Sequence, residues 1–467
     1  MRSWSAARIA AAADARVLSG TDVATGPARV VIDSRSLAPG DLFVGLAGAN
    51  IDGGRFAREA LAAGAWGVLG GSEHLDAIGD QGDAVLLASP DPVSALGLLA
   101  RAWRRELGAR VVAITGSTGK TSTKDILAAV LDGQLETVAS PRNQNTEIGL
   151  PLAILSAPAG TQALVLELAM RGAGQIAELT SICEPDVGVV VNVGPAHLEL
   201  LGSLEAVAAA KGELLAGLAA GSTAVVPAGE TLLDPFLRPD LDVLRFGPGG
   251  DVAVLDAGAD GVLVAVGDLR LTLEPGFRAA HLLTDLCAAL AAAHALAADP
   301  RSGPLRVEFS GLRNERLSLP GEVIVINDCY NANPMSMRAA LEELSRTAAG
   351  RRVAVLGDML ELGERDEQRY HRELGEAARA AGVALLVTVG PRARWAAEDF
   401  AGAGEHLHAT DAPAAAELLR TRLEPGDTVL VKGSRALALE RVAQALAGYG
   451  PVTAGAAAAA ADTFAGR

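Results

Sequence analysis

Short apolar runs alternate with amphipathic segments along most of this chain. In residues 109–304 the runs QALVLELAM (162–170) and DVGVVVNVG (186–194) are apolar almost throughout, which is typical of strands covered by helices on both faces. The alternation returns in residues 315–450, where EVIVIND, RRVAVLGDM, VALLVTVG and DTVLVKGS each precede a helical segment. We therefore predict an α/β protein with a mostly parallel central sheet and a second, Rossmann-like layer.

Residues 1–108 are predicted to form a smaller α/β domain in front of these two. We expect strands in VVIDSRS (30–36) and DLFVGLAG (41–48), and a helix in FAREALAAGA (56–65). The predicted domains are therefore 1–108, 109–314 and 315–450. Residues 451–467 are alanine-rich and of low complexity, so we expect a disordered tail.

The clearest chemical signal is ITGSTGKTSTKDIL, within residues 109–131. A buried strand is expected to enter a glycine turn and then a helix that begins at Lys120. Backbone N–H groups of such a turn, together with the positive end of the helix dipole, bind phosphate. Lys120 would reach the terminal phosphates of a nucleotide, and the Thr121 hydroxyl would bind the accompanying Mg²⁺. Ile114 stands where the common pattern has its first glycine, so the loop is a shorter TGSTGKTS variant.

Polar residues follow two of the central apolar runs. Glu167 lies toward the end of one run and His197 just past the end of the other. Ligands of open α/β sheets bind beyond the carboxyl ends of the strands, so both side chains could approach the same phosphates. A carboxylate suits Mg²⁺, and a neutral imidazole can complete its ligand shell. An ordinary strand-end charge and a histidine without a metal role remain the alternatives.

Other positions stay open from the residues alone. Ser34 and Arg35 form either a solvated turn or a grip on a phosphate of the substrate. Lys211, in the alanine-rich helix 203–218, is most simply a solvent-facing lysine. The apolar helix 281–296 is more typical of a core than of a site. Three strand ends of the last domain are polar and are predicted to form one wall of a cleft facing the phosphate loop; they are residues 328–334, 357–359 and 432–435.

Composition excludes some classes of function. The 467 residues have a formal charge of -16 and only 3 % aromatic residues, which argues against nucleic-acid binding as the main role. The three cysteines are far apart, with no CxxC spacing, which indicates a reducing compartment and no structural zinc. We find no signal peptide and no apolar run long enough to span a membrane, so we expect a soluble, cytoplasmic and monomeric protein.

As a set, the motifs resemble the Mur ligases, the ATP-dependent amide-bond-forming enzymes of cytoplasmic peptidoglycan synthesis. The N-terminal DSRSLAPGDLFVGLAG is similar to the nucleotide-sugar-binding domain of the members that add the third residue and the terminal dipeptide. DCYNANPMSM resembles the dipeptide-adding members, and neither the histidine-containing stretch nor the DNPR-like motif of third-residue-adding members is found. The matching motifs, in the family's order, are TGSTGKTS, NQNTEIGLPL, LELAMRGAGQIAEL, NVGPAHLELLGS, AAAKGEL, DCYNANPMSM, GDMLELGE and VKGSR.

The resemblance implies an ADP-forming ligase that joins UDP-N-acetylmuramoyl-tripeptide to D-alanyl-D-alanine through an acyl phosphate, with ATP and Mg²⁺, in cell-wall synthesis that supports cell shape and division. It implies a catalytic role for Lys120, His197 and Lys211, and carboxylation of Lys211 by carbon dioxide. The implied metal ligands are Thr121, Glu167, His197 and carboxylated Lys211. The implied ATP-binding residues are Thr115, Gly116, Ser117, Thr118, Gly119, Lys120, Thr121, Ser122, Asn327, Asp328, Tyr330 and Asn331. The implied substrate-binding residues are Ser34 and Arg35 for the nucleotide-sugar, Asn143, Asn145 and Thr146 for the muramoyl peptide, and Lys432, Ser434 and Arg435 for the dipeptide.

The chain departs from the family pattern at three places. Asp52-Gly53-Gly54 stands where relatives often have Asp-Gly-His, which puts a histidine contact to the nucleotide-sugar in doubt. Asp285 stands where asparagine is usual, which weakens a role of the His281 helix in adenine binding. The family's arginine at the domain joint is either Arg313 or Arg316.

Two other functions remain open. One is another ligase of this architecture, a third-residue-adding Mur ligase or a folylpolyglutamate synthetase. The other is a P-loop NTPase that serves as a binding or regulatory module and forms no amide. The sequence does not reveal which third residue the accepted peptide contains.

Overall fold

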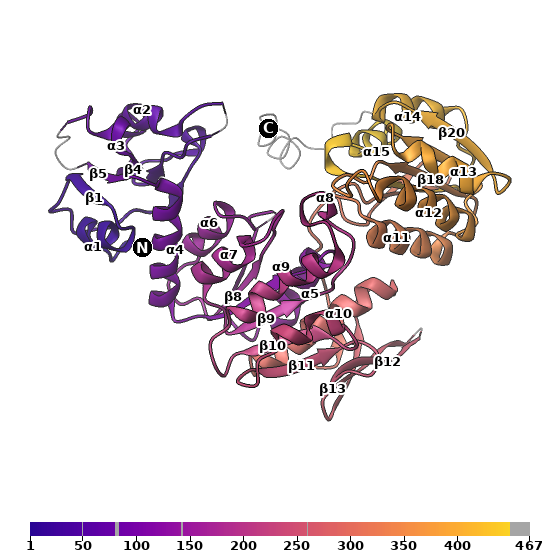
Figure 1. Ribbon diagram of the computed structural model, residues 1–467, viewed down its shortest axis with the longest axis horizontal. Helices are drawn as coiled ribbons and strands as arrows, with labels where there is room; N and C mark the ends of the chain where they lie inside the picture. Colours follow the sequence, from indigo (N-terminus) through magenta and orange to yellow (C-terminus); the bar gives the residue numbers. More distant parts are fainter. Residues whose placement is uncertain (49, 80–83, 142, 259, 449–467) are drawn as a thin grey trace.

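The computed structural model describes residues 1–48, 50–79, 84–141, 143–258 and 260–448. The chain forms three α/β units, and the N-terminal and C-terminal units lie on opposite sides of the central one (Figure 1). The α/β class and the three-unit architecture predicted from the hydrophobic pattern are therefore confirmed. The predicted tail, 451–467, lies outside the described residues.

The N-terminal unit is a five-stranded sheet in the order β1-β5-β4-β3-β2, in which only β1 is antiparallel to its neighbour. Its strands are β1 (Arg16–Ser19), β2 (Val30–Val31), β3 (Leu42–Val44), β4 (Gly67–Gly71) and β5 (Val85–Ser89). Its helices are α1 (Ala6–Ala12), η1 (Ser34–Ser36), η2 (Gly53–Phe56), α2 (Ala57–Ala62), α3 (Ser72–Leu75) and α4 (Pro92–Leu107).

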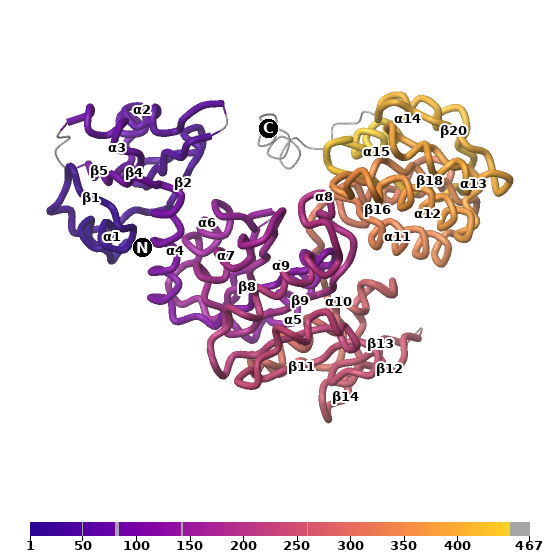
Figure 2. Tube along the Cα trace, in the orientation of Figure 1, coloured from indigo at the N-terminus to yellow at the C-terminus, as the bar shows by residue number. Residues whose placement is uncertain are grey.

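Helix α4 joins this unit to the central one. Asp91 caps its first turn by accepting the N–H groups of Val93 and Ser94, Pro92 occupies the first helical position, and Gly108 ends it with a φ of 63°. Its apolar face belongs to one continuous core that includes β3, β4 and β5 on one side and helices α6 and α7 on the other. Figure 2 shows this helix between the two units. The shared core fixes the N-terminal unit to the central sheet.

The central unit is a ten-stranded sheet in the order β15-β14-β13-β12-β11-β10-β9-β6-β8-β7. Its strands are β6 (Arg110–Thr115), β7 (Thr137–Ala139), β8 (Ala163–Glu167), β9 (Val187–Val190), β10 (Thr223–Pro227), β11 (Asp242–Phe246), β12 (Val252–Gly258), β13 (Gly261–Val266), β14 (Leu269–Glu274) and β15 (Gly303–Pro304). Its helices are α5 (Lys120–Leu131), α6 (Gly149–Ser156), α7 (Gln175–Cys183), α8 (Leu198–Leu201), α9 (Leu204–Ala216), η3 (Thr231–Phe236) and α10 (Ala280–Ala295).

Strands β6 to β11 are parallel, whereas β12, β13 and β14 form an antiparallel meander. Helices α5 and α10 cover one face of the sheet in a core that includes eight buried residues of α10 alone. The predicted core role of the 281–296 helix is thus confirmed. Strand β6 lies between β9 and β8 in the parallel part of the sheet, so its carboxyl end lies at the edge where ligands bind.

The C-terminal unit is a six-stranded sheet in the order β16-β17-β21-β18-β19-β20, with only β16 antiparallel. Its strands are β16 (Glu315–Leu319), β17 (Val323–Asn327), β18 (Arg352–Gly357), β19 (Leu385–Val389), β20 (Glu405–Ala409) and β21 (Thr428–Lys432). Its helices are α11 (Pro334–Thr347), α12 (Glu367–Ala380), η4 (Ala393–Trp395), α13 (Ala396–Phe400), α14 (Ala412–Arg420), η5 (Arg435–Leu437) and α15 (Glu440–Leu446). The four predicted strands are confirmed, and the polar edge strands β16 and β20 are additions to them.

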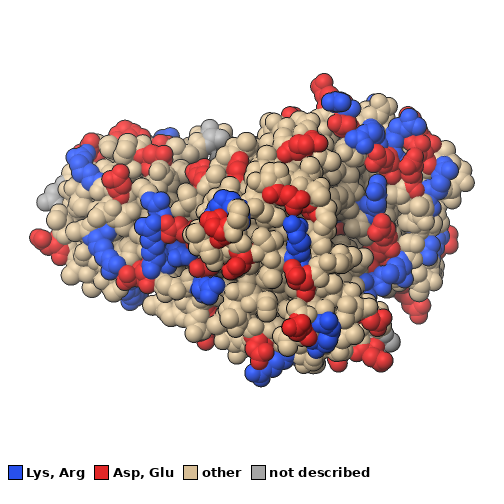
Figure 3. Space-filling view, turned by 60° about the horizontal axis from the view of Figure 1, so that its bottom comes forward, with Lys and Arg blue, Asp and Glu red and all other residues tan. Residues whose placement is uncertain are grey.

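Within the described residues, no helix has the length and apolar character needed to cross a membrane. On the face drawn in Figure 3, acidic and basic side chains are interspersed. The net charge of -16 is thus not gathered into a single acidic field on this face. Local sites must therefore attract the anionic ligands.

We predict that Gly212→Ala destabilises the protein, although alanine favours helices by about 1 kcal/mol. Gly212 lies inside α9, and a Cβ at this position would lie 2.5 Å from the ring of Phe236. Because the ring cannot withdraw without moving η3, we expect a net loss of about 1–2 kcal/mol, since overpacking costs about 1–3 kcal/mol. Calorimetric unfolding of the wild type and the variant measures this difference in stability.

Gly97→Ala in α4 is the matched control. There the new Cβ would meet only the end of the Ile182 side chain, at 3.1 Å, so we expect little loss. A Gly212→Ala protein at least as stable as the wild type would contradict the packing argument.

Candidate functional site

The predicted phosphate loop lies between β6 and α5, as the TGSTGKTS segment indicated. Gly119 precedes α5 with a φ of 77°, and a Cβ there would lie 2.4 Å from Oδ1 of Asp285. Both conformation and space therefore require glycine. Lys120 bends back over the loop, and its Nζ donates to the carbonyl oxygen of Gly116 at 2.9 Å.

Asn192, just after β9, organises the loop from the adjacent strand. Its Oδ1 accepts the backbone N–H groups of Ser117 at 3.1 Å and Thr118 at 2.9 Å. Its Nδ2 donates to Oγ1 of Thr118 at 3.0 Å. Sequence reasoning overlooked Asn192, although its place at the end of an apolar run gave the same signal as Glu167.

Glu167 and Thr121 are hydrogen-bonded to each other beside this loop. The Thr121 hydroxyl donates to Oε2 of Glu167 at 2.7 Å, and Nδ2 of Asn145 donates to Oε1 at 2.9 Å. Glu167 is only 2 % exposed, so its carboxylate is buried and held in one orientation. A hydroxyl beside a fixed carboxylate is an oxygen donor set of the kind that Mg²⁺ prefers. The residues present therefore fit the predicted metal.

Lys211 is buried, and the solvent-facing orientation expected from its helix is wrong. Its side chain in α9 is 1 % exposed, and among the described residues its ammonium has no hydrogen-bond or ion-pair partner. Burial, followed by the charge of Lys120, lowers the pKa of Lys211 well below its usual value. Burial likewise lowers the pKa of Lys120, which the Glu167 carboxylate opposes and Arg313 reinforces. An alanine-rich helix has no polar face, so periodicity could not orient its lysine.

His197 contacts the C-terminal unit. It precedes α8 with a φ of 57°, and its Nδ1 lies 2.6 Å from Oε2 of Glu361. The backbone N–H of Glu199 also donates to the carbonyl oxygen of Glu361 at 3.1 Å. The hydrogen bond and charge of His197 keep the pKa of Glu361 below its usual value. His197 therefore links the central unit to the segment that follows β18.

A second contact between these units involves the phosphate loop itself. Nδ2 of Asn333, the N-cap of α11, donates to the carbonyl oxygen of Ser117 at 3.2 Å. Met335 packs so closely on Gly194 that a Cβ on the glycine would overlap its sulfur. The strand end 328–334 thus faces the phosphate loop.

The structure distinguishes the two candidate arginines of the domain joint. The guanidinium of Arg313 lies 4.2 Å from the ring centroid of Tyr330, and its charge acts on Lys120. Arg316 lies farther along β16, where it pairs with Glu343 at 3.7 Å. We assign the joint to Arg313.

Four of the remaining predicted residues of the C-terminal unit, Asn327, Lys432, Ser434 and Arg435, bond to groups within that unit. Lys432 is 3 % exposed, and its Nζ donates to Oδ2 of Asp328 at 2.6 Å and to the carbonyl oxygen of Asn331 at 3.1 Å. Ser434 accepts the N–H of Leu360 at 2.9 Å. Asn327 and Arg435 bond to Glu315 and Glu440 at 2.9 and 2.8 Å. Lys432 therefore holds the loop after β17 in place.

The other predicted substrate residues lie at two further loops. Thr146 begins the turn into α6, where its Oγ1 accepts the N–H of Gly149 at 3.4 Å, and Asn143 bonds through its carbonyl oxygen to the N–H of Asn145 at 2.8 Å. Ser34 and Arg35 form η1 directly after β2, and Nη2 of Arg35 pairs with Asp33 at 2.9 Å.

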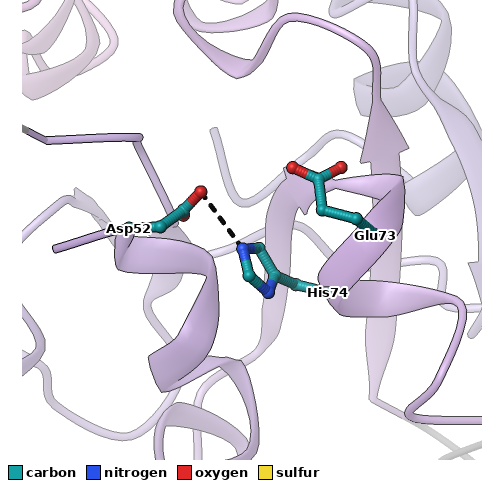
Figure 4. Close-up of side chains that lie close together, drawn as sticks. All are labelled: Asp52, Glu73 and His74. Atoms are coloured by element: carbon teal, nitrogen blue, oxygen red, sulfur yellow. Dashed lines mark ion pairs between the residues drawn. The ribbon is translucent and has the colours of Figure 1, made fainter.

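A cluster of Asp52, Glu73 and His74 lies at the same edge of the N-terminal sheet, after β3 and β4 (Figure 4). Nε2 of His74 is 3.1 Å from Oδ2 of Asp52. The potential ligand atoms of the three residues lie within 4.8 Å of one another. Sequence reasoning missed this cluster because Asp52 and His74 are 22 positions apart.

Asp285 lies buried beneath the phosphate loop. Burial raises the pKa of its carboxyl to about 7. Oγ of Ser122 lies 2.5 Å from Oδ2 of Asp285 and 3.1 Å from the carbonyl oxygen of Gly119. A hydroxyl has one proton and cannot donate to both oxygens. The Ser122 hydroxyl therefore donates to Asp285 or to Gly119, but not to both at once.

The phosphate loop, the buried oxygen donors and the facing third unit define a multidomain P-loop protein that binds a nucleoside triphosphate. Family models match three segments: "Mur ligase family, catalytic domain" at 28–103, "Mur ligase middle domain" at 114–293 and "Mur ligase, glutamate ligase domain" at 312–435. The chain belongs to the Mur ligase family.

Its relatives have consistent names. A UDP-N-acetylmuramoyl-tripeptide--D-alanyl-D-alanine ligase of Escherichia coli is 36 % identical over 448 residues, covering 92 % of this chain and 95 % of that protein. The Bacillus subtilis protein of the same name is 32 % identical over 429 residues, covering 89 % and 92 %. The resemblance inferred from the motifs is thus confirmed.

Solved structures agree with this family. A crystal structure of MurF from Acinetobacter baumannii matches with a TM-score of 0.84 and 26 % identity, over 95 % of this chain and 98 % of that one. MurF from Thermotoga maritima in complex with ADP matches with a TM-score of 0.77 and 31 % identity, over 90 % and 97 %.

We predict that Asp285→Asn removes a pH-dependent loss of stability. A carboxyl whose pKa is near 7 in the folded state and 3.8 when unfolded contributes stability in full below pH 3.8, and this stability is lost as pH rises through 7. The loss is on the order of 4 kcal/mol. Unfolding midpoints of wild type and variant between pH 5 and 9 should therefore diverge, with the variant more stable at high pH.

Asp242→Asn, at an exposed position of β11, is the control and should follow the wild type. Parallel curves for wild type and Asp285→Asn would show that Asp285 is ionised throughout.

Proposed function

We propose that this chain is the ADP-forming ligase that joins the carboxylate of UDP-N-acetylmuramoyl-tripeptide to the amine of D-alanyl-D-alanine. The proposal rests on one observation above all. The phosphate loop, with the Thr121–Glu167 pair at its mouth, faces the C-terminal unit, whose Asn333 reaches Ser117. ATP bound there would meet a substrate held between two units.

The reaction requires ATP and the substrate carboxylate to be bound next to each other. A carboxylate resists attack by an amine, because its charge makes it a poor electrophile and oxide is a poor leaving group. Transfer of the γ-phosphoryl group of ATP to the carboxylate forms an acyl phosphate and releases ADP. The dipeptide amine then attacks the acyl carbon, phosphate leaves, and the amine loses a proton. Catalysis consists mainly of positioning and neutralisation of phosphate charge by Lys120, and closure of the units excludes the water that would hydrolyse the acyl phosphate.

Thr121 and Glu167 would hold Mg²⁺, and His197 would join them on release from Glu361. When bound, the ion neutralises charge on the transferring phosphoryl group. The chain's own contribution is to fix the Glu167 carboxylate through Asn145 and Thr121.

The surroundings of Lys211 favour carboxylation of its side chain. A buried amine with a lowered pKa is uncharged for a larger fraction of the time, and only the uncharged amine captures carbon dioxide. Addition to the carbon forms an N–C bond, and the amine loses a proton to give an anionic carbamate. The carbamate would balance the charge of Lys120 and supply oxygen donors, which an ammonium cannot do.

The substrates would lie along the sheet edges that face this loop. Ser34 and Arg35 would hold the nucleotide-sugar, and Asn143, Asn145 and Thr146 the muramoyl peptide. Asp328, Tyr330 and Asn331 would border the nucleotide, and Ser434 and Arg435 the dipeptide. Lys432 and Asn327 would act through the loops that they hold.

We predict that phosphate release from ATP and Mg²⁺ depends on both substrates. With UDP-N-acetylmuramoyl-tripeptide, D-alanyl-D-alanine should raise the rate at least tenfold above that with single amino acids or no amine. Mass spectrometry should show the pentapeptide product. Tripeptides with lysine and with diaminopimelate at the third position should be tested in parallel.

Equal phosphate release with and without the dipeptide would overturn this substrate assignment. Release with a single amino acid and UDP-N-acetylmuramoyl-dipeptide would instead identify a third-residue-adding ligase. Release independent of any amine would indicate a nucleotide-hydrolysing module.

We predict that carbon dioxide supports activity through Lys211. Wild-type activity should fall several-fold in degassed buffer and recover with bicarbonate, whereas Lys211→Ala should be at least about a hundredfold less active and insensitive to bicarbonate. A carbamate signal in the ¹³C NMR spectrum with ¹³C-bicarbonate should be present only in the wild type. Its absence from an active wild type would exclude carboxylation.

A further inference from the structure

The Asp52-Gly53-Gly54 segment lacks the histidine that related enzymes often have, and its Gly54 packs against His74. A Cβ on Gly54 would lie 2.3 Å from Cδ2 and 2.9 Å from Cγ of His74. Gly54 lies in η2 with a negative φ, which any residue can adopt. The imidazole of His74 thus fills the space that a side chain at position 54 would occupy.

Hydrogen bonds fix the orientation of this imidazole. Oδ1 of Asp52 accepts the N–H of Gly54 at 2.8 Å, and its Oδ2 lies 3.1 Å from Nε2 of His74. Burial would raise the pKa of Asp52, but its bonds to Gly54 and His74 hold it below the usual value. A carboxylate can only accept, so Nε2 is the protonated nitrogen. In the neutral imidazole Nδ1 of His74 is then an acceptor, and among the described residues it has no hydrogen-bond partner.

The position of His74 suits a ligand contact. It follows β4 at the carboxyl edge of the parallel strands, the edge at which Arg35 follows β2 and Asp52 follows β3. The His74 side chain is 24 % exposed, and the carboxylates of Asp52 and Glu73 lie beside it (Figure 4). Two carboxylates repel a diphosphate, so the ligand group at this point must be uncharged.

We propose that His74, presented from α3, contacts the uridine nucleotide-sugar in place of a histidine at position 54, with Nδ1 accepting a hydrogen bond from an uncharged N–H or O–H group. The imide N–H of the base and the sugar hydroxyls are such groups, whereas the diphosphate belongs toward Arg35. This inference rests on the proposed function, since it names a residue for the same substrate.

The test compares His74→Ala, Gly54→His and the double variant Gly54→His/His74→Ala. His74→Ala should raise the KM for UDP-N-acetylmuramoyl-tripeptide about tenfold, the effect of one lost hydrogen bond. Its kcat and the KM values for ATP and the dipeptide should stay within twofold. Gly54→His alone should lower the unfolding midpoint because its Cβ overlaps the ring of His74. The double variant should recover most of the lost affinity, because it places an imidazole in the same space from the other element.

His294→Ala, at an exposed position of α10, is the control and should leave the KM unchanged. An unchanged KM in His74→Ala, or a folded double variant that binds no better than His74→Ala, would overturn the proposal. A chelator that weakens wild-type binding as much as His74→Ala does would also overturn it, because the imidazole would then be a metal ligand.

Direct binding separates this inference from the function. Calorimetric titration with UDP-N-acetylmuramoyl-tripeptide requires no turnover. If the wild type binds it but forms no product with the dipeptide, the proposed ligation fails while the His74 comparison still holds. If the wild type ligates and His74→Ala binds equally well, only the inference fails.

Discussion

The burial of like charges at one sheet edge constrains the rest of this structure. After burial, the charge of Lys120 lowers the pKa of Lys211, and the buried carboxylate of Glu167 favours the charged form of Lys120. Burying charges is costly unless they are paired. The charge of one carboxylate cannot balance the charges of two lysines, so the site favours the binding of anions. Nucleotide phosphates, and the carbamate proposed for Lys211, would both supply the missing negative charge.

The contacts between the central and C-terminal units are arranged around this imbalance. Asn333 bonds to the phosphate loop, and Glu361 takes the imidazole of His197. Both contacts use groups next to the phosphate site, so any ligand that moves the loop or recruits His197 must alter the interface. Site occupancy and the relative position of the units are thereby coupled through two polar contacts, which are weaker and easier to exchange than an apolar core.

The sequence predicted what is local and missed what long-range packing decides. The phosphate loop is a contiguous strand–turn–helix, so its glycines and Lys120 were readable directly. The polar strand ends pointed to Glu167 and His197 because parallel strands share one ligand edge. In contrast, the contact of Asn192 depends on which strands become neighbours, and that of Glu361 on which units face each other. Lys211 was assigned to solvent because an alanine-rich helix has no polar face, and only the surrounding core shows that it is buried.

The N-terminal unit shows why a departure from a motif is weak evidence for a lost function. From the sequence alone, a glycine at position 54 suggests that an imidazole has been lost. In the structure, the imidazole of His74, which belongs to α3, occupies the space beside this glycine. A hydrogen bond depends on where the acceptor atom lies and which nitrogen is protonated, not on which residue number supplies it. The position of an imidazole can thus be retained while the residue that supplies it changes.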